Sequence, residues 1–256
     1  MFIAIDEKGN RITVEEIQAG EKYFCPVCHA PVIIKAQNSY GVKTHFSHQR
    51  GTQCLDDWKY DMSEWHYKWQ ECFPVEQREI TVQTEDACHR ADAILCNTVF
   101  EFQHSPLSFE EFTNRNQFYL KCGYDIVWIF DATKKVKNPE IMLEPPCCNN
   151  DLTERHLKWK RKQDIFKKFN YPPNAKIAIY LEVEMQNREE KILIPLKNID
   201  PLFPTAHFCV PVISPKNLLK EYRLINNEKI LSISEIIENT RAVREKYAQR
   251  FRGRFF

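Results

Sequence analysis

The chain has 256 residues, enough for one large domain or two smaller ones, and its hydrophobic fraction of 43% is that of a globular protein with a sizeable core. The formal net charge of +1 excludes no class of partner, because the distribution of the basic residues matters more than their sum. The first residues lack the basic region and apolar run of a signal peptide, and no stretch reaches the about 18 apolar residues that span a bilayer. We therefore expect a cytoplasmic protein with no membrane partner.

The N-terminal part of the chain predicts two short strands and then a metal site. Residues 1–20 favour a strand, a turn and a second strand, whereas residues 21–57 are irregular and rich in cysteine and histidine. The whole chain has ten cysteines, which in a reducing compartment indicate metal ligands and buried thiols and not a disulfide framework.

Five side chains of this segment are candidate zinc ligands. Cys25 and Cys28 form a CxxC knuckle, and His45, His48 and Cys54 follow it. Four of the five could make a tetrahedral zinc site. We prefer Cys25, Cys28, His48 and Cys54, with His45 as a substitute ligand, because the two histidines are closer in sequence than is usual within one site. The zinc would be structural; the alternative is a set of reduced thiols without metal.

The middle of the chain has the clearest periodicity. Ser63 is a plausible cap for a first helix on which Trp65, Trp69 and Cys72 share a face, and Ser108 has the signature of a cap for a second helix. The predicted order is helix, three strands, helix and strand, at residues 62–73, 78–83, 89–95, 98–103, 108–122 and 125–130.

The C-terminal part begins after the proline- and asparagine-rich residues 138–150, which are the best candidate for a domain boundary. Beyond them the pattern predicts a basic amphipathic helix, two strands and a final helix, near residues 151–169, 176–184, 191–197 and 232–250.

Two acidic residues are predicted to share one face of a hairpin. If Cys96 and Asn97 form a two-residue loop, Asp92 faces Glu101 directly across the strands, and Gln103 lies on the same face. Opposed like charges are destabilising, and a hard divalent cation is the natural group to offset them. The alternative is a solvated strand face that carries acids by chance, and a longer loop would stagger the pair.

At this point the sequence resembles a known family. The order of elements, with SEWHYKWQ and RADAILCNTVFEFQ, is similar to the PD-(D/E)XK nuclease superfamily. Within it, the blocks CPVCHAPV, HFSH, HRADAIL, EFQHSPLSFEEFTNRNQFY and GYDIVWIFD resemble the CoiA-like competence proteins. The resemblance, which covers about residues 23–132, implies an α/β fold with a restriction-endonuclease-like core (α-β-β-β-α-β) and an N-terminal zinc-binding segment; the residues beyond it predict a basic α+β C-terminal region. These three domains would occupy residues 1–57, 58–137 and 150–256.

The resemblance also implies roles for particular residues. Asp92 and Glu101 would bind the catalytic Mg²⁺ or Mn²⁺, and Glu64 would approach the same metal directly or through water. Gln103 stands where the superfamily usually has lysine; it supplies no positive charge but can orient the attacking water. Arg115 would contact phosphate from the second helix.

Basic residues with interleaved aromatic residues suggest a nucleic acid as partner. They cluster in ERHLKWKRKQDIFKKFN and in the C-terminal tail, and the alternative is a solvated helix face. The candidate phosphate contacts are Lys158, Lys160, Arg161 and Lys162. The sequence thus predicts a metal-dependent nuclease for single-stranded, duplex or branched DNA, in competence and recombination or in antiviral defence, together with proteins of those pathways. The alternative is a catalytically inactive nucleic-acid-binding module of a DNA-processing complex.

Overall fold

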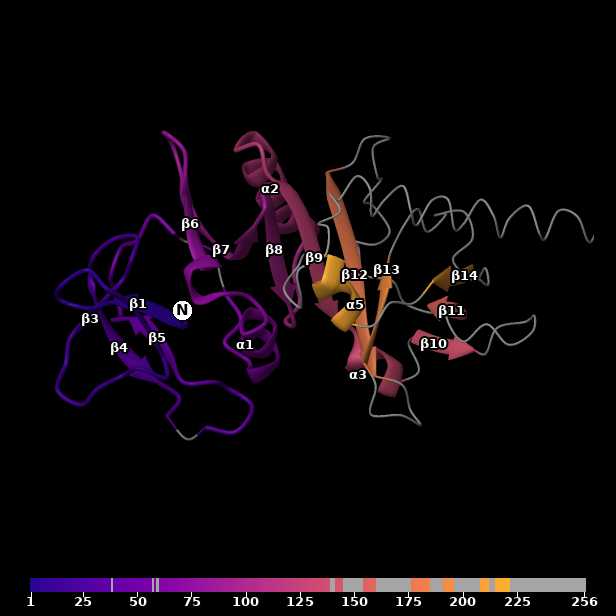
Figure 1. The fold of residues 1–256 in the computed structure, drawn as a ribbon, viewed down its shortest axis with the longest axis horizontal. Helices are drawn as coiled ribbons and strands as arrows, with labels where there is room; N and C mark the ends of the chain where they lie inside the picture. The colour runs from indigo at the N-terminus through magenta and orange to yellow at the C-terminus, as the bar shows by residue number, and fades with distance from the viewer. Residues whose placement is uncertain are drawn as a thin grey trace, which may run out of the picture. The chain divides into compact units, whose positions relative to one another are not determined.

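A computed structural model gives the fold of the chain (Figure 1). It describes residues 1–37, 39–56, 58, 60–138, 141–144, 154–159, 176–184, 191–195, 208–211 and 215–221. The chain divides into two compact units, the first made of Met1–Pro106 with Lys121–Gly123 and the second of Leu107–Leu120 with Tyr124–Phe256.

The first unit begins with a five-stranded sheet. Its order is β2-β1-β3-β4-β5, and each strand pairs with its neighbours in antiparallel fashion. The two strands predicted within residues 1–20 are confirmed, but residues 21–57 also contribute three strands and are less irregular than predicted. The strands are β1 (Ile3–Ile5), β2 (Arg11–Thr13), β3 (Tyr23–Phe24), β4 (Pro31–Lys35) and β5 (His45–His48). Short strands suffice here because Phe2, Tyr23 and Phe46 bury a common apolar cluster against them.

Helix α1 (Glu64–Gln70) follows and begins where the sequence predicts. The hydroxyl of Ser63 accepts a hydrogen bond from the His66 N–H at 3.2 Å, which satisfies a donor that the first helical turn leaves open. The residues predicted to share a face are buried to different extents, because Trp69 is buried whereas Trp65 and Cys72 are only partly so. His66, Tyr67 and Gln70 are buried as well.

Three antiparallel strands complete the first unit after a short 3-10 turn, η1 (Val75–Gln77): β6 (Arg78–Gln83), β7 (Cys88–Leu95) and β8 (Thr98–Gln103). They confirm the three strands predicted for this region. Cys96 and Asn97 form the two-residue loop between β7 and β8, with φ of 48° and 61°. Two positive φ values are what a tight hairpin turn needs, because that twist matches the twist of the strands.

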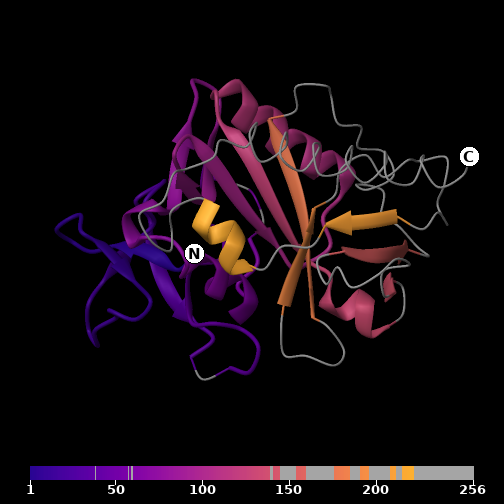
Figure 2. The ribbon, with the colours of Figure 1, turned by 45° about the vertical axis from the view of Figure 1, so that its right-hand side comes forward.

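The second unit contains α2 (Phe109–Lys121) for most of its length and the buried strand β9 (Asp125–Asp131), both as predicted. The Ser108 hydroxyl accepts from the Glu111 N–H at 3.0 Å, which confirms the expected cap. Strand β9 runs parallel to β12 (Ile177–Glu184), and β12 pairs in antiparallel fashion with β13 (Lys191–Pro195). Figure 2 shows β9 and β12 side by side.

A separate three-stranded sheet shows that one prediction was wrong. Its order is β10-β11-β14, from β10 (Ile141–Glu144), β11 (Glu154–Trp159) and β14 (Phe208–Pro211). The basic helix predicted near residues 151–169 is therefore wrong over β11, because pairing on both sides overrides the local helical preference. Residues 160–169 and the helix predicted near 232–250 lie outside the described residues.

The remaining described helices are short: α3 (Thr133–Lys137) and α5 (Pro215–Glu221). Within the described ranges, no helix has the length and apolar character needed to cross a membrane.

Candidate functional site

The first candidate site is a cysteine-rich turn between β3 and β4. The Cys25 N–H donates to the Ala30 carbonyl oxygen, and the His29 N–H donates to the Cys25 carbonyl oxygen, both at 2.9 Å. His29 closes the turn with a φ of 57°. This tight loop brings Cys28 back beside Cys25, as the CxxC spacing requires.

Four side chains meet at this turn. One ligand atom from each of Cys25, Cys28, His48 and Cys54 lies within 4.8 Å of every other one. A tetrahedral zinc with Zn–S bonds of about 2.3 Å sets its sulfur ligands roughly 3.8 Å apart, so the cluster has the right size and donor chemistry for zinc. The four residues are those that the sequence favoured as ligands.

His45 lies outside the cluster. Its Nδ1 is 2.9 Å from the carbonyl oxygen of Lys43. His45 and His48 are three residues apart in β5, and because alternate residues of a strand point to opposite faces, only one of them can turn toward the thiols.

The thiols need a cation to ionise. Burial raises the pKa of Cys25, and it raises the pKa of Cys54 to about 12. Without a metal these groups therefore stay protonated at neutral pH, whereas zinc binds thiolates and would displace the protons. The chemistry of the cluster thus fits a structural metal and not a reactive thiol.

The second candidate site lies at the end of the β7–β8 hairpin ladder. Leu95 pairs with Thr98 and Ala93 with Phe100, as the predicted two-residue loop requires. Continuing that register would set Asp92 opposite Glu101, and these are the first residues past the paired part of the two strands.

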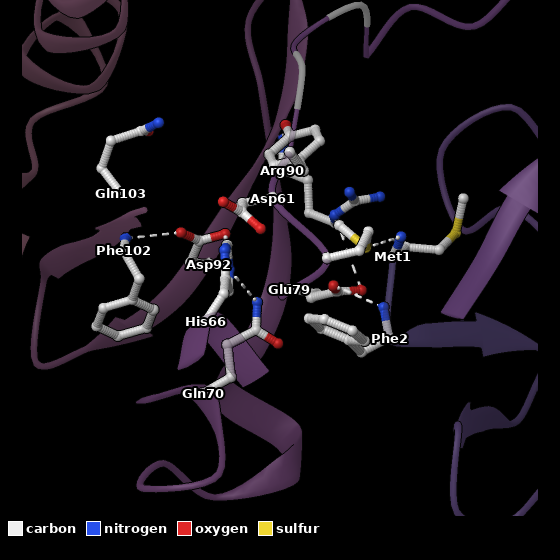
Figure 3. A network of polar contacts seen from close by, with 12 residues as sticks. Met1, Phe2, Asp61, His66, Gln70, Glu79, Arg90, Asp92, Phe102 and Gln103 are labelled. Atoms are coloured by element: carbon white, nitrogen blue, oxygen red, sulfur yellow. Dashed lines mark hydrogen bonds and ion pairs between the residues drawn. The ribbon is translucent and has the colours of Figure 1, made fainter. Parts of the chain in front are cut away.

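The structure shows why the pairing of β7 and β8 ends at Asp92 and Glu101. In a continued ladder the Phe102 N–H would donate to the backbone of β7. Instead it donates to Asp92 Oδ2 at 2.8 Å (Figure 3). Asp92 and Glu101 are 3% and 1% exposed, so two carboxylates are buried where two neighbouring strands cease to pair. Burying ionised carboxylates is unfavourable unless partners or a metal compensate.

Helix α1 supplies a partner for the first carboxylate. His66 Nε2 lies 3.0 Å from Asp92 Oδ1, and Gln70 Nε2 lies 3.1 Å from the same ring nitrogen (Figure 3). Burial lowers the pKa of His66, but the facing Asp92 carboxylate, aided by the charges of Asp61 and Glu79, outweighs it and raises the pKa above its ordinary value. The 3.0 Å contact fits an N–H at Nε2 that donates to the Asp92 carboxylate.

The other predicted site residues are placed as follows. Glu64 is exposed at the start of α1, and none of the described contacts joins it to Asp92. Gln103 donates its amide nitrogen to the carbonyl oxygen and hydroxyl of Ser105, at 2.8 and 3.1 Å. Arg115 belongs to the second unit, where it donates to Glu111 at 2.6 Å.

Close to this pair lies a buried polar network that the sequence did not reveal. Glu79 of β6 has a φ of 46°, a strained value for glutamate, and its carboxylate accepts the N–H groups of Phe2 and Ile3 at 2.7 and 3.0 Å. Arg90 Nε lies 3.8 Å from the same carboxylate (Figure 3). The network thereby joins the first strand of the chain to the strand that carries Asp92.

Arg90 extends this network toward the cluster of Cys25, Cys28, His48 and Cys54. Its guanidinium lies 4.2 Å from the ring centre of Tyr60 and 3.7 Å from Asp56, and the Tyr60 hydroxyl donates to Asp56 at 2.6 Å. Burial opposes the charge of Arg90, but the carboxylates of Glu79 and Asp56 and the Tyr60 oxygen raise its pKa above the ordinary value. Asp56 is two residues from Cys54, so the network ends next to the metal cluster.

Within the described residues, no second group of three or more His, Cys, Asp or Glu side chains is close enough together to hold an ion. A metal at Asp92 and Glu101 would therefore take its other ligands from water and from phosphate oxygens. That is the usual binding mode of Mg²⁺, which keeps several waters and is held by one or two carboxylates.

These features belong to a nuclease-like protein, and comparison with known families names the class. Residues 57–145 match the family model described as competence protein CoiA, nuclease-like domain, and residues 7–56 match the one described as competence protein CoiA, N-terminal domain. The two matches together cover more than half of the chain, which therefore belongs to the CoiA family, as the sequence motifs indicated. No curated protein and no solved structure matches it.

Proposed function

We propose that the chain is a metal-dependent nuclease that hydrolyses phosphodiester bonds in DNA in a competence-related process. The observation that carries the proposal is the buried pair Asp92 and Glu101 at the point where β7 and β8 separate, within the nuclease-like segment of the family. A divalent cation would offset the mutual repulsion of these two neighbouring carboxylates, and such a cation can activate a water and neutralise the phosphate in phosphodiester hydrolysis.

The chemistry divides between the metal and the chain. Bound Mg²⁺ or Mn²⁺ would lower the pKa of a water and neutralise the scissile phosphate. Asp92 and Glu101 would hold the cation. The Gln103 amide nitrogen is engaged by Ser105, so only its oxygen would be available to orient a water. Glu64, being exposed, would act at the metal only through water.

We also propose that the six elements form a PD-(D/E)XK core. Along the chain, α1, β6, β7, β8, α2 and β9 follow in the order helix, three strands, helix and strand, which supports this assignment. We further propose that the chain has three domains, at residues 1–57, 58–137 and 150–256, and that the protein acts in the cytoplasm.

DNA phosphates are the proposed partners of the basic residues. Arg115, Lys158, Lys160, Arg161 and Lys162 would contact the backbone, which carries one negative charge per nucleotide. Antiviral defence is a second pathway in which the same chemistry would serve.

A cleavage assay tests the proposal. Single-stranded, duplex and branched DNA are incubated with the full chain and Mg²⁺ or Mn²⁺. Asp92→Asn and Glu101→Gln should each lower the rate by more than about 100-fold, beyond the 10–100-fold typical of changes around a metal ligand. Asp86→Asn, at an exposed acid of the same unit, is the matched control and should cleave normally. Full activity in a folded Asp92→Asn protein would overturn the assignment.

The second candidate is a nucleic-acid-binding module without activity. It is favoured by one observation: Gln103 replaces the usual cationic residue, and its amide nitrogen is turned to Ser105. DNA binding by the unmodified protein, with no cleavage of any of the three substrates in either metal, would select this candidate.

A further inference from the structure

We propose that His66 is a positioning residue that fixes the orientation of the Asp92 carboxylate for metal binding. This inference rests on the proposed function, and it assigns to helix α1 a role in the site that differs from that of a metal ligand.

The first argument is that both oxygens of the Asp92 carboxylate are held by hydrogen bonds. His66 Nε2 lies 3.0 Å from Oδ1, and the Phe102 N–H donates to Oδ2 at 2.8 Å. Two hydrogen bonds from different elements, a helix and a strand, fix the plane of the carboxylate. Each carboxylate oxygen can accept more than one bond, so these contacts do not by themselves exclude a cation.

The second argument is that His66 is itself held rigidly. The ring is 2% exposed and lies edge-on to Phe2 and Phe102, with ring centres 5.9 Å away in each case. Gln70 Nε2 lies 3.1 Å from the same ring nitrogen, so a second side chain of α1 also braces the ring. The ring therefore has little freedom to turn away from Asp92.

The third argument is that packing alone would not select a histidine here. His66 Nδ1 is buried and has no hydrogen-bond partner among the described residues, which costs about 1–3 kcal/mol. An apolar side chain between Phe2 and Phe102 would avoid that penalty. What the histidine adds is the bond to Asp92, so the unfavourable buried nitrogen is explained by a requirement at the carboxylate.

Groups that hold a metal ligand in this way have a known effect. Loss of such a partner typically lowers metal affinity or activity by about 10–100-fold, because the ligand then adopts several orientations. His66 should therefore change the affinity for the metal more than the rate at saturating metal.

The experiment measures Mn²⁺ binding to the full chain by electron paramagnetic resonance, and the Mg²⁺ dependence of DNA cleavage. His66→Leu removes the donor, and His66→Gln keeps an N–H near the same place. We expect the Mn²⁺ dissociation constant to rise about 10–100-fold in His66→Leu and to return to within about threefold of the original in His66→Gln. Tyr67→Phe, on the same helix and facing Glu15 instead, is the control and should bind Mn²⁺ normally.

The outcomes separate this inference from the proposed function. An unchanged Mn²⁺ affinity in folded His66→Leu, with Asp92→Asn binding weakly, would overturn only the role of His66. Normal binding and cleavage in Asp92→Asn would overturn the proposed function itself. If His66→Leu does not fold, His66→Asn takes its place, because its shorter amide cannot reach Asp92; equal affinities in the Asn and Gln variants would then overturn the role of His66.

Discussion

Arg90 shows how a single buried charge can hold several segments together. It is 4% exposed, and its partners come from β6, from the segment before α1 and from the stretch after the zinc ligands. Replacing a whole buried ion-pair network by apolar side chains often costs little stability, but removal of Arg90 alone would leave the carboxylates that face it uncompensated.

The stability of the first unit should therefore depend on Arg90. Arg90→Met keeps much of the volume but leaves Glu79 and Asp56 without their shared cation. We expect the free energy of unfolding, measured by urea denaturation, to fall by about 3–5 kcal/mol. Arg50→Met, at an exposed arginine, should change it by less than about 0.5 kcal/mol. A decrease below about 1 kcal/mol for Arg90→Met would show that the network is not a stabilising unit.

At the scale of elements, the alternation of side chains along β5 determines which histidine lies near the thiols. His48 should be required for zinc and His45 should not, because the alternation of the strand points them to opposite faces. We expect the purified protein to contain about one zinc per chain. His48→Ala should weaken zinc affinity by more than about 100-fold, measured by competition with a colorimetric chelator.

His45→Ala provides the matched control for that measurement, since it removes an imidazole from the same strand. It should retain its zinc and melt at nearly the same temperature. A purified protein without zinc, or equal zinc depletion in both variants, would contradict the assignment of the cluster.

The elements that the sequence predicts best are those with strong local signals. β6 and β8 have the predicted bounds because short alternating apolar runs are flanked by turn residues, and the Cys96–Asn97 loop sets the hairpin register. The strand β11 was not predicted, because its partner β14 is distant in sequence and its partner β10 lies within residues 138–150, which the sequence favoured as a domain boundary. The amphipathic periodicity of this basic segment predicted a helix, but strand pairing on both sides of β11 determines its structure.

The same contrast between local signals and distant partners applies to the candidate sites. The four candidate zinc ligands follow from sequence spacing, and the Asp92–Glu101 pair follows from counting along a hairpin. The partners of Glu79 are 76 and 77 residues away, so no sequence pattern could connect them. His66 was visible as a polar residue on a helix, but its contact with Asp92 depends on how α1 packs on β8, as does the lack of such a described contact for Glu64.

At the scale of the whole molecule, DNA binding should show the signature of phosphate contacts. Charge reversal at Lys158, Lys160, Arg161 and Lys162 should lower the slope of log affinity against log salt by about 0.9 for each phosphate that is no longer neutralised on duplex DNA. Sequence preference should stay the same, because phosphates carry no base identity. Trp159→Ala should lower affinity for single strands by about 1–3 kcal/mol if the ring stacks on bases.

The control for this measurement reverses charges elsewhere on the chain. Lys8→Glu with Lys22→Glu, both exposed in the first unit, should leave the salt slope unchanged. A folded four-residue variant with the original slope would place the DNA contacts on other residues.

The carboxylate of Glu79 has a consequence for how this family can diversify. Glu79 lies within the nuclease-like segment, yet the backbone donors that it requires come from Phe2 and Ile3. An exchange of N-terminal segments between relatives would thus succeed only where the incoming backbone presents two N–H groups to this acid. Because backbone donors are independent of side-chain identity, the residues at these two positions can drift while the junction persists. The start of the chain and the nuclease-like segment should therefore depend on each other structurally, although Phe2 and Ile3 precede the matched N-terminal segment, which begins at residue 7.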